Sequence, residues 1–243
     1  MPYESGHSKN VANFNQLIQI CTGFGADYNP SNPALALTAL NLLFTNADNS
    51  IKNIHTLMPP LTNAVNTRQA KFDSLSSLVT RIVNALASSD VPKEIIADAK
   101  TLARKIQGRR AGPKIADDPN TPEDESLNNI SASQMSFDNR IANFDQLIKL
   151  VASQPGFSPN EADLKVAALQ TFQTDLISFN SSVISVTVPV GNARISRNNL
   201  LYDKLAGIVA VALLIKKYIS SLYGANSQQY KLVKGIKFTM VKI

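Results

Sequence analysis

Few side chains in this chain have the types and spacing that catalysis or metal binding requires. His7 and His55 are the only histidines, and no second histidine, cysteine or carboxylate follows either one at a spacing of three or four residues. A di-iron bundle needs Glu-x-x-His on each of two helices, and the two histidines of this chain do not both belong to such a pattern. We therefore expect no metal site, and we interpret His55 as a helix-surface residue.

The single cysteine, Cys21, is predicted to be structural. One cysteine excludes an intramolecular disulfide framework and any CxxC metal site. A nucleophilic thiol needs a neighbouring base, and the sequence offers no base that can be placed beside Cys21. The phosphate-binding patterns GxGxxG and GxxxxGKS or GxxxxGKT do not occur either. The sequence thus predicts no catalytic residue, no cofactor and no enzymatic activity.

The densest group of positive charges consists of Lys100, Arg104, Lys105, Arg109 and Arg110. One interpretation of this group is contact with a polyanion such as RNA. The stretch lacks aromatic residues on which bases stack, and the acidic segment that follows it can neutralise it. We favour a solvated helix end paired with its own linker. The net charge of +6 does not by itself indicate nucleic acid as a partner.

Polar residues recur at matching places in the two halves of the chain. Asn63 and Arg68 match Asn192 and Arg197, each 129 residues later. Because arginine is rarely buried without a partner, one interpretation is a set of cross-helix hydrogen bonds that fix helix register. The other is a small-ligand site near the prolines, where both arginines would meet an anionic molecule. We favour the interpretation in which these residues fix helix register, and we keep all four as candidate ligand-binding residues.

These recurring residues belong to a longer internal repeat. Residues 11–20 read VANFNQLIQI and residues 141–150 read IANFDQLIKL, so six of ten positions are identical. Two copies are too few for a solenoid, so the repeat predicts pseudo-twofold pairing of the halves. Further along the chain a one-residue slip would match Phe72, Asp73 and Leu75 with Tyr202, Asp203 and Leu205.

The repeat divides the chain into three predicted parts. Residues 1–108 form the first helical repeat, residues 109–133 an acidic linker that contains Pro119 and Pro122, and residues 134–243 the second repeat with a C-terminal tail. The prolines and like charges of the linker oppose a packed element. Its acidic residues lack the spacing of a calcium-binding loop, so we expect a solvated tether.

Each repeat is predicted to contain a short helix, a long helix and a second short helix. The apolar residues of the first short helix share one face, which we expect to be buried: Val11, Phe14, Leu17, Ile18 and Cys21. Apolar residues at steps of three and four continue through Pro59 and Pro60 in the first repeat and through Pro189 in the second. A stripe that keeps its phase across a proline favours one long kinked helix. An antiparallel hairpin that turns at the prolines is the alternative. The sequence therefore predicts an all-α, elongated helical bundle with coiled-coil-like packing.

The ends of the elements carry local signals. The tail, residues 236–243, alternates apolar and polar side chains over its first five positions. A lone strand has no partner in an all-helical protein, so the tail either packs irregularly across the bundle, which we favour, or pairs with another chain. The expected helix caps are Asn32, Asp90, Asn160 and Asn226 or Ser227, with Gly108 as a stop signal.

The most apolar stretch, residues 205–215, is too short to cross a bilayer. Its eleven residues rise about 16 Å as a helix, roughly half of a hydrocarbon core. A buried bundle helix is favoured, and a membrane-inserting segment is the alternative. The first ten residues lack the basic start and apolar run of a secretory signal, which predicts a cytoplasmic location.

Together these features predict a non-catalytic structural or protein-interaction protein. We expect it to self-associate as a homo-oligomer or to bind another protein, through its long helices or its tail. A helical bundle that binds a small ligand near the prolines and a membrane-active helical protein are the alternatives.

Overall fold

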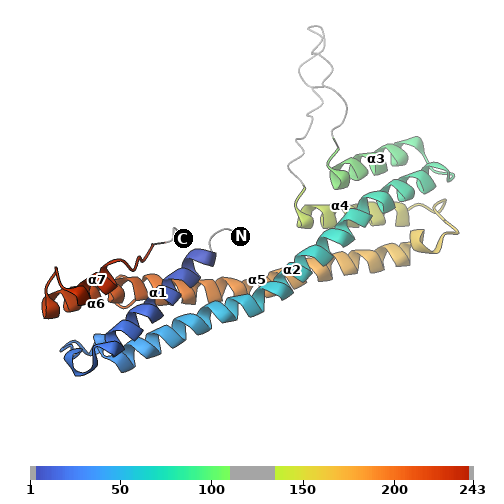
Figure 1. The fold of residues 1–243 in the computed structure, drawn as a ribbon. Helices are drawn as coiled ribbons and strands as arrows, with labels where there is room; N and C mark the ends of the chain where they lie inside the picture. The colour runs from blue at the N-terminus through green and yellow to red at the C-terminus, as the bar shows by residue number, and fades with distance from the viewer. Residues whose placement is uncertain (1–3, 110–134, 241–243) are drawn as a thin grey trace, which may run out of the picture. The chain divides into compact units, whose positions relative to one another are not determined.

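The protein is all-helical in the part of the chain that the structure describes. The computed structural model describes residues 4–109 and 135–240, which contain seven α-helices and no strand (Figure 1). The all-α prediction is therefore confirmed for these residues. The predicted linker lies outside them except for Arg109. The helices are α1 (Glu4–Gly23), α2 (Leu37–Ala87), α3 (Lys93–Gln107), α4 (Phe137–Ala152), α5 (Val166–Tyr202), α6 (Ile208–Tyr223) and α7 (Gln228–Lys234).

The prolines lie inside the two long helices. Pro59 and Pro60 are within α2, and Pro189 is within α5. A proline has no amide hydrogen, so the carbonyl four residues earlier loses its helical partner. All three prolines are exposed, so water can reach those carbonyls. The prediction of long helices that continue through the prolines is confirmed, and the hairpin alternative is wrong.

The chain divides into two compact units, which we call unit 1 and unit 2. Unit 1 comprises residues 1–61 and 186–243, and unit 2 comprises residues 62–185. Both boundaries fall within a few residues of the prolines. Each unit therefore combines part of the first predicted repeat with part of the second. The units are defined by contacts between residues, whereas a repeat is defined by common ancestry. The repeat boundaries read from the sequence therefore stay a prediction.

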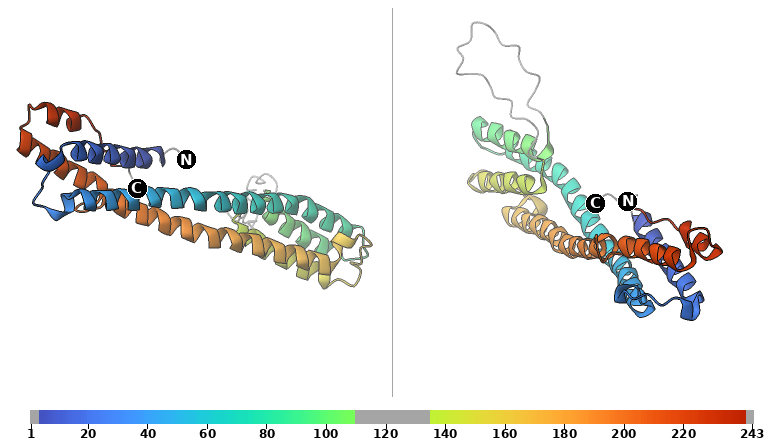
Figure 2. Two further views of the ribbon diagram at one scale, coloured as in Figure 1. Left: turned by 60° about the horizontal axis from the view of Figure 1, so that its bottom comes forward. Right: turned by 90° about the vertical axis from the view of Figure 1, so that its left-hand side faces the viewer.

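Unit 1 has its own apolar core around α1 and α6. Helix α1 packs against α6 and α7, and α6 also contacts the 3-10 turn Pro33–Leu35 (Figure 2). The face of α1 predicted from the sequence is the buried one. Its members are Val11, Phe14, Leu17, Ile18 and Cys21, each less than 5% exposed. The predicted burial of this helix face is confirmed.

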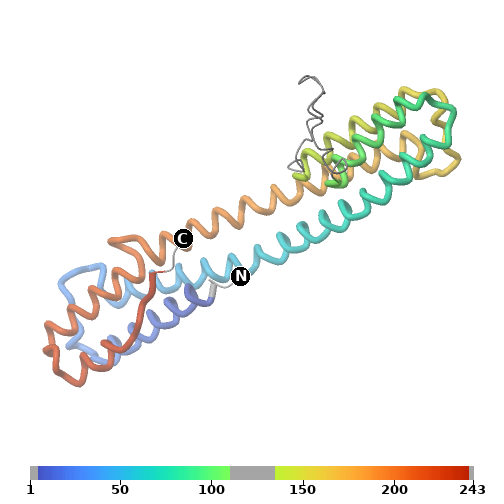
Figure 3. The backbone as a smooth tube through the Cα atoms, turned by 90° about the horizontal axis from the view of Figure 1, so that it is seen from above, coloured from blue at the N-terminus to red at the C-terminus, as the bar shows by residue number. Residues whose placement is uncertain are grey.

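Unit 2 has a second core, in which α3 packs against α4 (Figure 3). The first part of α5 contributes Leu169 and Leu176, both fully buried. Helix α3 adds Ala99, Ala103 and Ile106, and further buried residues come from the last part of α2 and the apolar side of α4. Their largest fully buried side chains are Phe72, Leu75, Ile82, Leu86, Phe144 and Leu147.

Buried positions recur with the same spacing in the two units. In α2 they are Leu75, Leu78, Val79, Ile82 and Leu86, and in α6 they are Ile208, Val211, Ala212, Ile215 and Ile219. The slip proposed from the sequence does not fit this pattern, because Leu75 is fully buried whereas Leu205 is 84% exposed. Leu75 and Leu205 therefore do not occupy equivalent places in the two cores, and the sequence match itself stays a prediction. Helix α5 ends at Tyr202 and a turn precedes α6, whereas α2 runs through the corresponding residues without a break.

The cap predictions are confirmed at some helix ends and wrong at others. Asn32 accepts a hydrogen bond from the Ala34 amide, although it caps the 3-10 turn that precedes α2. Ser227 accepts from the amide of Tyr230 at the start of α7. Gly108 ends α3 with φ of 67°, the left-handed region that favours glycine. Asp90 and Asn160 are not caps, because Pro92 and Glu161 occupy those positions.

Candidate functional site

The arginine predicted as a ligand-binding residue in unit 2 lies in a polar network. The Arg68 guanidinium lies 3.8 Å from the centre of the Phe137 ring. Its Nη1 donates to Oδ1 of Asn180 at 3.0 Å, and Nδ2 of Asn180 donates to Asp138 at 2.8 Å. The Nε of Arg68 is buried and has no hydrogen-bond partner among the described residues. The network connects α2, α4 and α5, as the register interpretation requires.

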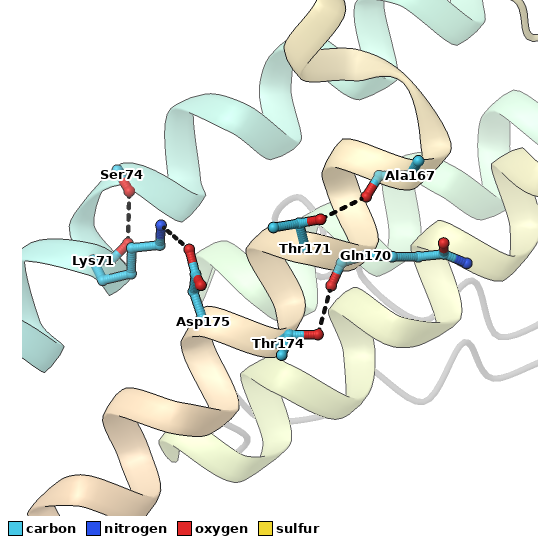
Figure 4. Close-up of polar contacts among 7 residues, drawn as sticks. All are labelled: Lys71, Ser74, Ala167, Gln170, Thr171, Thr174 and Asp175. Atoms are coloured by element: carbon cyan, nitrogen blue, oxygen red, sulfur yellow. Dashed lines mark hydrogen bonds and ion pairs between the residues drawn. The ribbon is translucent and has the colours of Figure 1, made fainter.

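A second charged contact joins α2 to α5 in the same unit. Nζ of Lys71 lies 2.8 Å from Oδ2 of Asp175 and 4.2 Å from the centre of the Phe172 ring (Figure 4). The pair is partly exposed, so it contributes little stability. In the same view Thr171 and Thr174 donate to carbonyls of their own helix. Lys71 itself contacts α5 at two side chains, Asp175 and Phe172.

Arg140 on α4 is a buried charged residue that the sequence interpretation missed. It is 8% exposed, and it donates from Nε to the Ile106 carbonyl at 3.1 Å and from Nη2 to the Phe72 carbonyl at 2.9 Å. Burial lowers the pKa of this guanidinium, and the charge of Asp73 opposes that shift. Its position in the sequence was the signal that could have identified it. Arg140 lies 130 residues after Asn10, on the apolar side of the predicted helix.

The other predicted ligand-binding residues are divided between the units. Asn63 lies in unit 2, whereas Asn192 and Arg197 lie in unit 1. Both asparagines are exposed, and Arg197 is 5% exposed. Arg197 donates from Nε and Nη2 to Oδ1 of its neighbour Asn198, at 3.1 and 2.8 Å. A single site built from all four residues stays a prediction.

The predicted polyanion contact is carried by α3 and the residues after it. Lys100 and Arg104 are exposed on α3, Lys105 is half-buried and Arg109 is exposed, while Arg110 lies outside the described residues. Nη2 of Arg104 donates to Oγ1 of Thr101 at 2.8 Å. No ion pair between described residues includes any of these cations, and binding of a polyanion stays a prediction.

The reactive side chains are either buried or isolated. Cys21 is fully buried, and burial raises the pKa of its thiol to about 12. His7 is 3% exposed, with Nδ1 2.6 Å from the hydroxyl of Tyr202, whereas His55 is exposed on α2. Within residues 4–109 and 135–240, no group of three or more His, Cys, Asp or Glu side chains is placed to hold a metal ion.

Apolar side chains on α5 face outward in both units. In unit 2, Ile177 and Ile184 are 47% and 58% exposed, and in unit 1, Val188 and Ile195 are 56% and 60% exposed. The members of each pair are seven residues apart, so they lie on one face of the helix. The sequence interpretation assigned only the buried stripe of α5. The available signal was that this helix carries apolar residues on more than one face.

A shallow surface pocket lies in unit 1 where α5 ends. Its lining includes Tyr202, Asp203 and Leu205. Oδ1 of Asp203 accepts hydrogen bonds from the amides of Ala206 and Leu205, which lower the pKa of the carboxyl group. These bonds fix a turn that holds Leu205 outward. The lining also includes Lys204, Asn198 and Asn199.

Comparisons with known proteins give no family or relative for this chain. No protein-family model, no curated protein and no solved structure matches it. Among the helices that the structure describes, none combines the length and apolar character needed to cross a membrane.

Proposed function

We propose that the protein is a non-catalytic helical interaction protein that associates with copies of itself. The observation that carries this proposal is the outward-facing apolar pair on α5 in each unit, Ile177 with Ile184 and Val188 with Ile195. Apolar side chains arranged along one helix face, away from the core, favour an interface with another chain.

Small residues beside these pairs support the proposal. Ser181 lies between Ile177 and Ile184 in unit 2, and Gly191 lies between Val188 and Ile195 in unit 1. A Cβ at Gly191 would meet no atom within 4 Å. A helix from a second copy can approach α5 closely at such positions, and burying the apolar pairs favours association by about 25 cal/mol for each Å² removed from water.

Sedimentation velocity over a concentration series tests this proposal. We expect the unmodified chain to form oligomers as concentration rises. The double variant Ile184→Asn with Ile195→Asn should raise the concentration needed for association at least tenfold. Leu42→Asn is the matched control, because Leu42 is 62% exposed but lies on α2. A monomer at every concentration, or equal effects of both changes, would refute the proposal.

We also propose that the two repeats descend from one duplicated helical unit and pair pseudo-symmetrically. Three observations support this: the identity between residues 11–20 and 141–150, the shared spacing of buried residues in α2 and α6, and the composition of the units. Each unit combines the first short helix and the start of the long helix of one repeat with the later part of the other.

Binding of a small anionic ligand is the second candidate function. It is supported by the buried Nε of Arg68, which has no hydrogen-bond partner among the described residues. Such a group can donate a hydrogen bond to an anion without losing an existing bond. Native mass spectrometry of freshly purified protein tests this candidate. A retained mass that disappears in Arg68→Gln supports it, and an empty spectrum at native pH counts against it.

A further inference from the structure

The C-terminal segment 236–240 is held in unit 1 by side chains that bind its main chain. It follows α7 without forming a helix or strand. Nδ2 of Asn10 donates to the Thr239 carbonyl at 2.8 Å, and the Thr239 amide donates to Oδ1 of Asn10 at 3.0 Å. Nδ2 of Asn13 donates to the Lys237 carbonyl at 2.7 Å. Lys216 on α6 donates to the Ile236 carbonyl.

The two asparagines are suited to binding an extended peptide. They are three residues apart on α1, so they lie on one side of the helix. An asparagine amide offers both a donor and an acceptor, as a peptide group does. Asn10 uses both on Thr239, as a neighbouring strand would, and Asn13 binds the residue two positions earlier. We call Asn10, Asn13 and Lys216 the tail clamp.

Alternate side chains of the segment turn toward the helices. Ile236 is 7% exposed, Lys237 is exposed, Phe238 is half-buried and Thr239 is exposed. Nζ of Lys216 lies 5.5 Å from the centre of the Phe238 ring. This alternation is that of an extended chain with one side packed on a surface. Main-chain bonds supply affinity in this binding mode, and the apolar side chains at every second residue supply specificity.

Unit 2 contains no such clamp at the corresponding positions. Arg140, which lies 130 residues after Asn10, donates to main-chain carbonyls of α2 and α3. Asn143, which corresponds to Asn13, donates to the carbonyl of Asn139 in its own helix. The equivalent side chains of unit 2 are therefore used within the core, and the clamp is a feature of unit 1.

We propose that the tail clamp is a peptide-binding site whose intermolecular ligand is segment 236–240 of a second copy of this chain, exchanged for the chain's own segment. The exchanged segment makes the same contacts in both arrangements, so exchange conserves them. The segment joins α7 through Gly235, where a Cβ would meet no atom within 4 Å. This exposed glycine gives the chain a pivot. The inference does not depend on the apolar pairs of α5.

Peptide binding to the full chain tests the site itself. Thr239→Pro removes the amide that donates to Asn10 and should release the chain's own segment, while the exposed Thr239 side chain contributes nothing to the core. A labelled peptide of residues 235–240 should bind this variant about 3- to 10-fold more tightly than it binds the unmodified chain, because the substitution weakens the competing segment by that factor. The same peptide with proline at Thr239 should bind about 3- to 10-fold more weakly, as expected for one lost hydrogen bond.

A variant of the clamp distinguishes this site from nonspecific apolar binding. Asn13→Ala, added to Thr239→Pro, should weaken the peptide about 3- to 10-fold. Circular dichroism and urea denaturation check that each variant is folded, and Phe238→Ser is a second means of releasing the segment. The proposal would be overturned if the peptide bound neither the Thr239→Pro variant nor the Phe238→Ser variant. It would also be overturned if adding Asn13→Ala to Thr239→Pro left the affinity for the peptide unchanged.

Exchange between copies is tested by mixing two complementary chains. One carries Asn13→Ala and Lys216→Met, which weaken its clamp but leave its tail intact. The other carries Thr239→Pro, which weakens its tail but leaves its clamp intact. Both also carry Ile184→Asn and Ile195→Asn, so association through α5 cannot produce the result. We expect the mixture to form heterodimers that neither chain forms alone, and a mixture of monomers would overturn the exchange.

Discussion

The guanidinium of Arg140 donates to the main-chain carbonyl of Phe72 at 2.9 Å from within the core of unit 2. Its Nε also donates to the Ile106 carbonyl, so one side chain binds the backbone of both α2 and α3. The ring of Phe72 lies beneath the same guanidinium, 5.1 Å from ring centre to Cζ. Arg140 thereby connects α4 to both α2 and α3.

Arg140→Met should destabilise unit 2. The methionine fills a similar volume but removes the side-chain donors to the Ile106 and Phe72 carbonyls, which should lower the free energy of unfolding by about 2–4 kcal/mol. Urea denaturation followed by circular dichroism measures the change. Arg104→Met is the matched control, since Arg104 is exposed on α3. Equal denaturation midpoints for the two variants would contradict this role.

Leu75→Ala and Leu205→Ala should differ strongly in stability. Leu75 is fully buried, so its truncation creates a cavity and should cost about 2–5 kcal/mol. Leu205 is 84% exposed, and its truncation should change stability by less than about 0.5 kcal/mol. Thermal or urea denaturation of both variants tests the burial difference between these residues. A large loss in Leu205→Ala would mean that its turn packs against the core.

Asp145 should contribute to stability at neutral pH and lose that contribution in acid. Hydrogen bonds from Lys149 and then Gln173 hold the pKa of its carboxyl group below the ordinary value. A pKa lowered by folding means that the native state binds fewer protons, so stability falls as pH drops below about 4, where unfolded aspartates titrate. Asp145→Asn should lose less stability than the unmodified chain between about pH 5 and pH 2. Parallel losses would contradict this assignment.

Cys21 should resist thiol reagents in the native protein. Its side chain is fully buried, and its raised pKa, about 12, keeps the thiol protonated. At pH 8 a disulfide reagent should label it on the order of 100-fold more slowly than in urea. A Ser77→Cys change in a Cys21→Val background gives an exposed control thiol. Rapid native labelling of Cys21 would indicate that α1 opens readily.

The sequence predicts the helices well because helical periodicity is a local property of the chain. The face of α1 from Val11 to Cys21 and the passage of α2 through Pro59 and Pro60 both follow from steps of three and four residues. The break after Tyr202 was missed because a turn that preserves helical phase leaves the apolar spacing nearly unchanged. Likewise, the division into units depends on contacts between distant segments, which no local spacing encodes.

The candidate residues were harder to predict, because the sequence identifies a polar residue but not its partner. The sequence identifies Arg68 as a candidate residue, yet its contacts with Asn180 and Phe137 depend on how α2, α4 and α5 pack in unit 2. Asn10 gave no signal at all, since its partner Thr239 lies 229 residues away. The prediction that the tail packs irregularly is confirmed for residues 236–240, but the side chains that hold it were not foreseen.

Cysteine cross-linking at the exposed face of α5 tests the proposed self-association most directly. In a Cys21→Val background, Ile184→Cys places one thiol on that face. Leu232→Cys places one on α7, where the Leu232 side chain is 59% exposed. If copies meet through α5, a short bifunctional maleimide should link Ile184→Cys chains into dimers efficiently and Leu232→Cys chains poorly. Equal yields at the two positions, or no dimer at Ile184→Cys, would contradict the account.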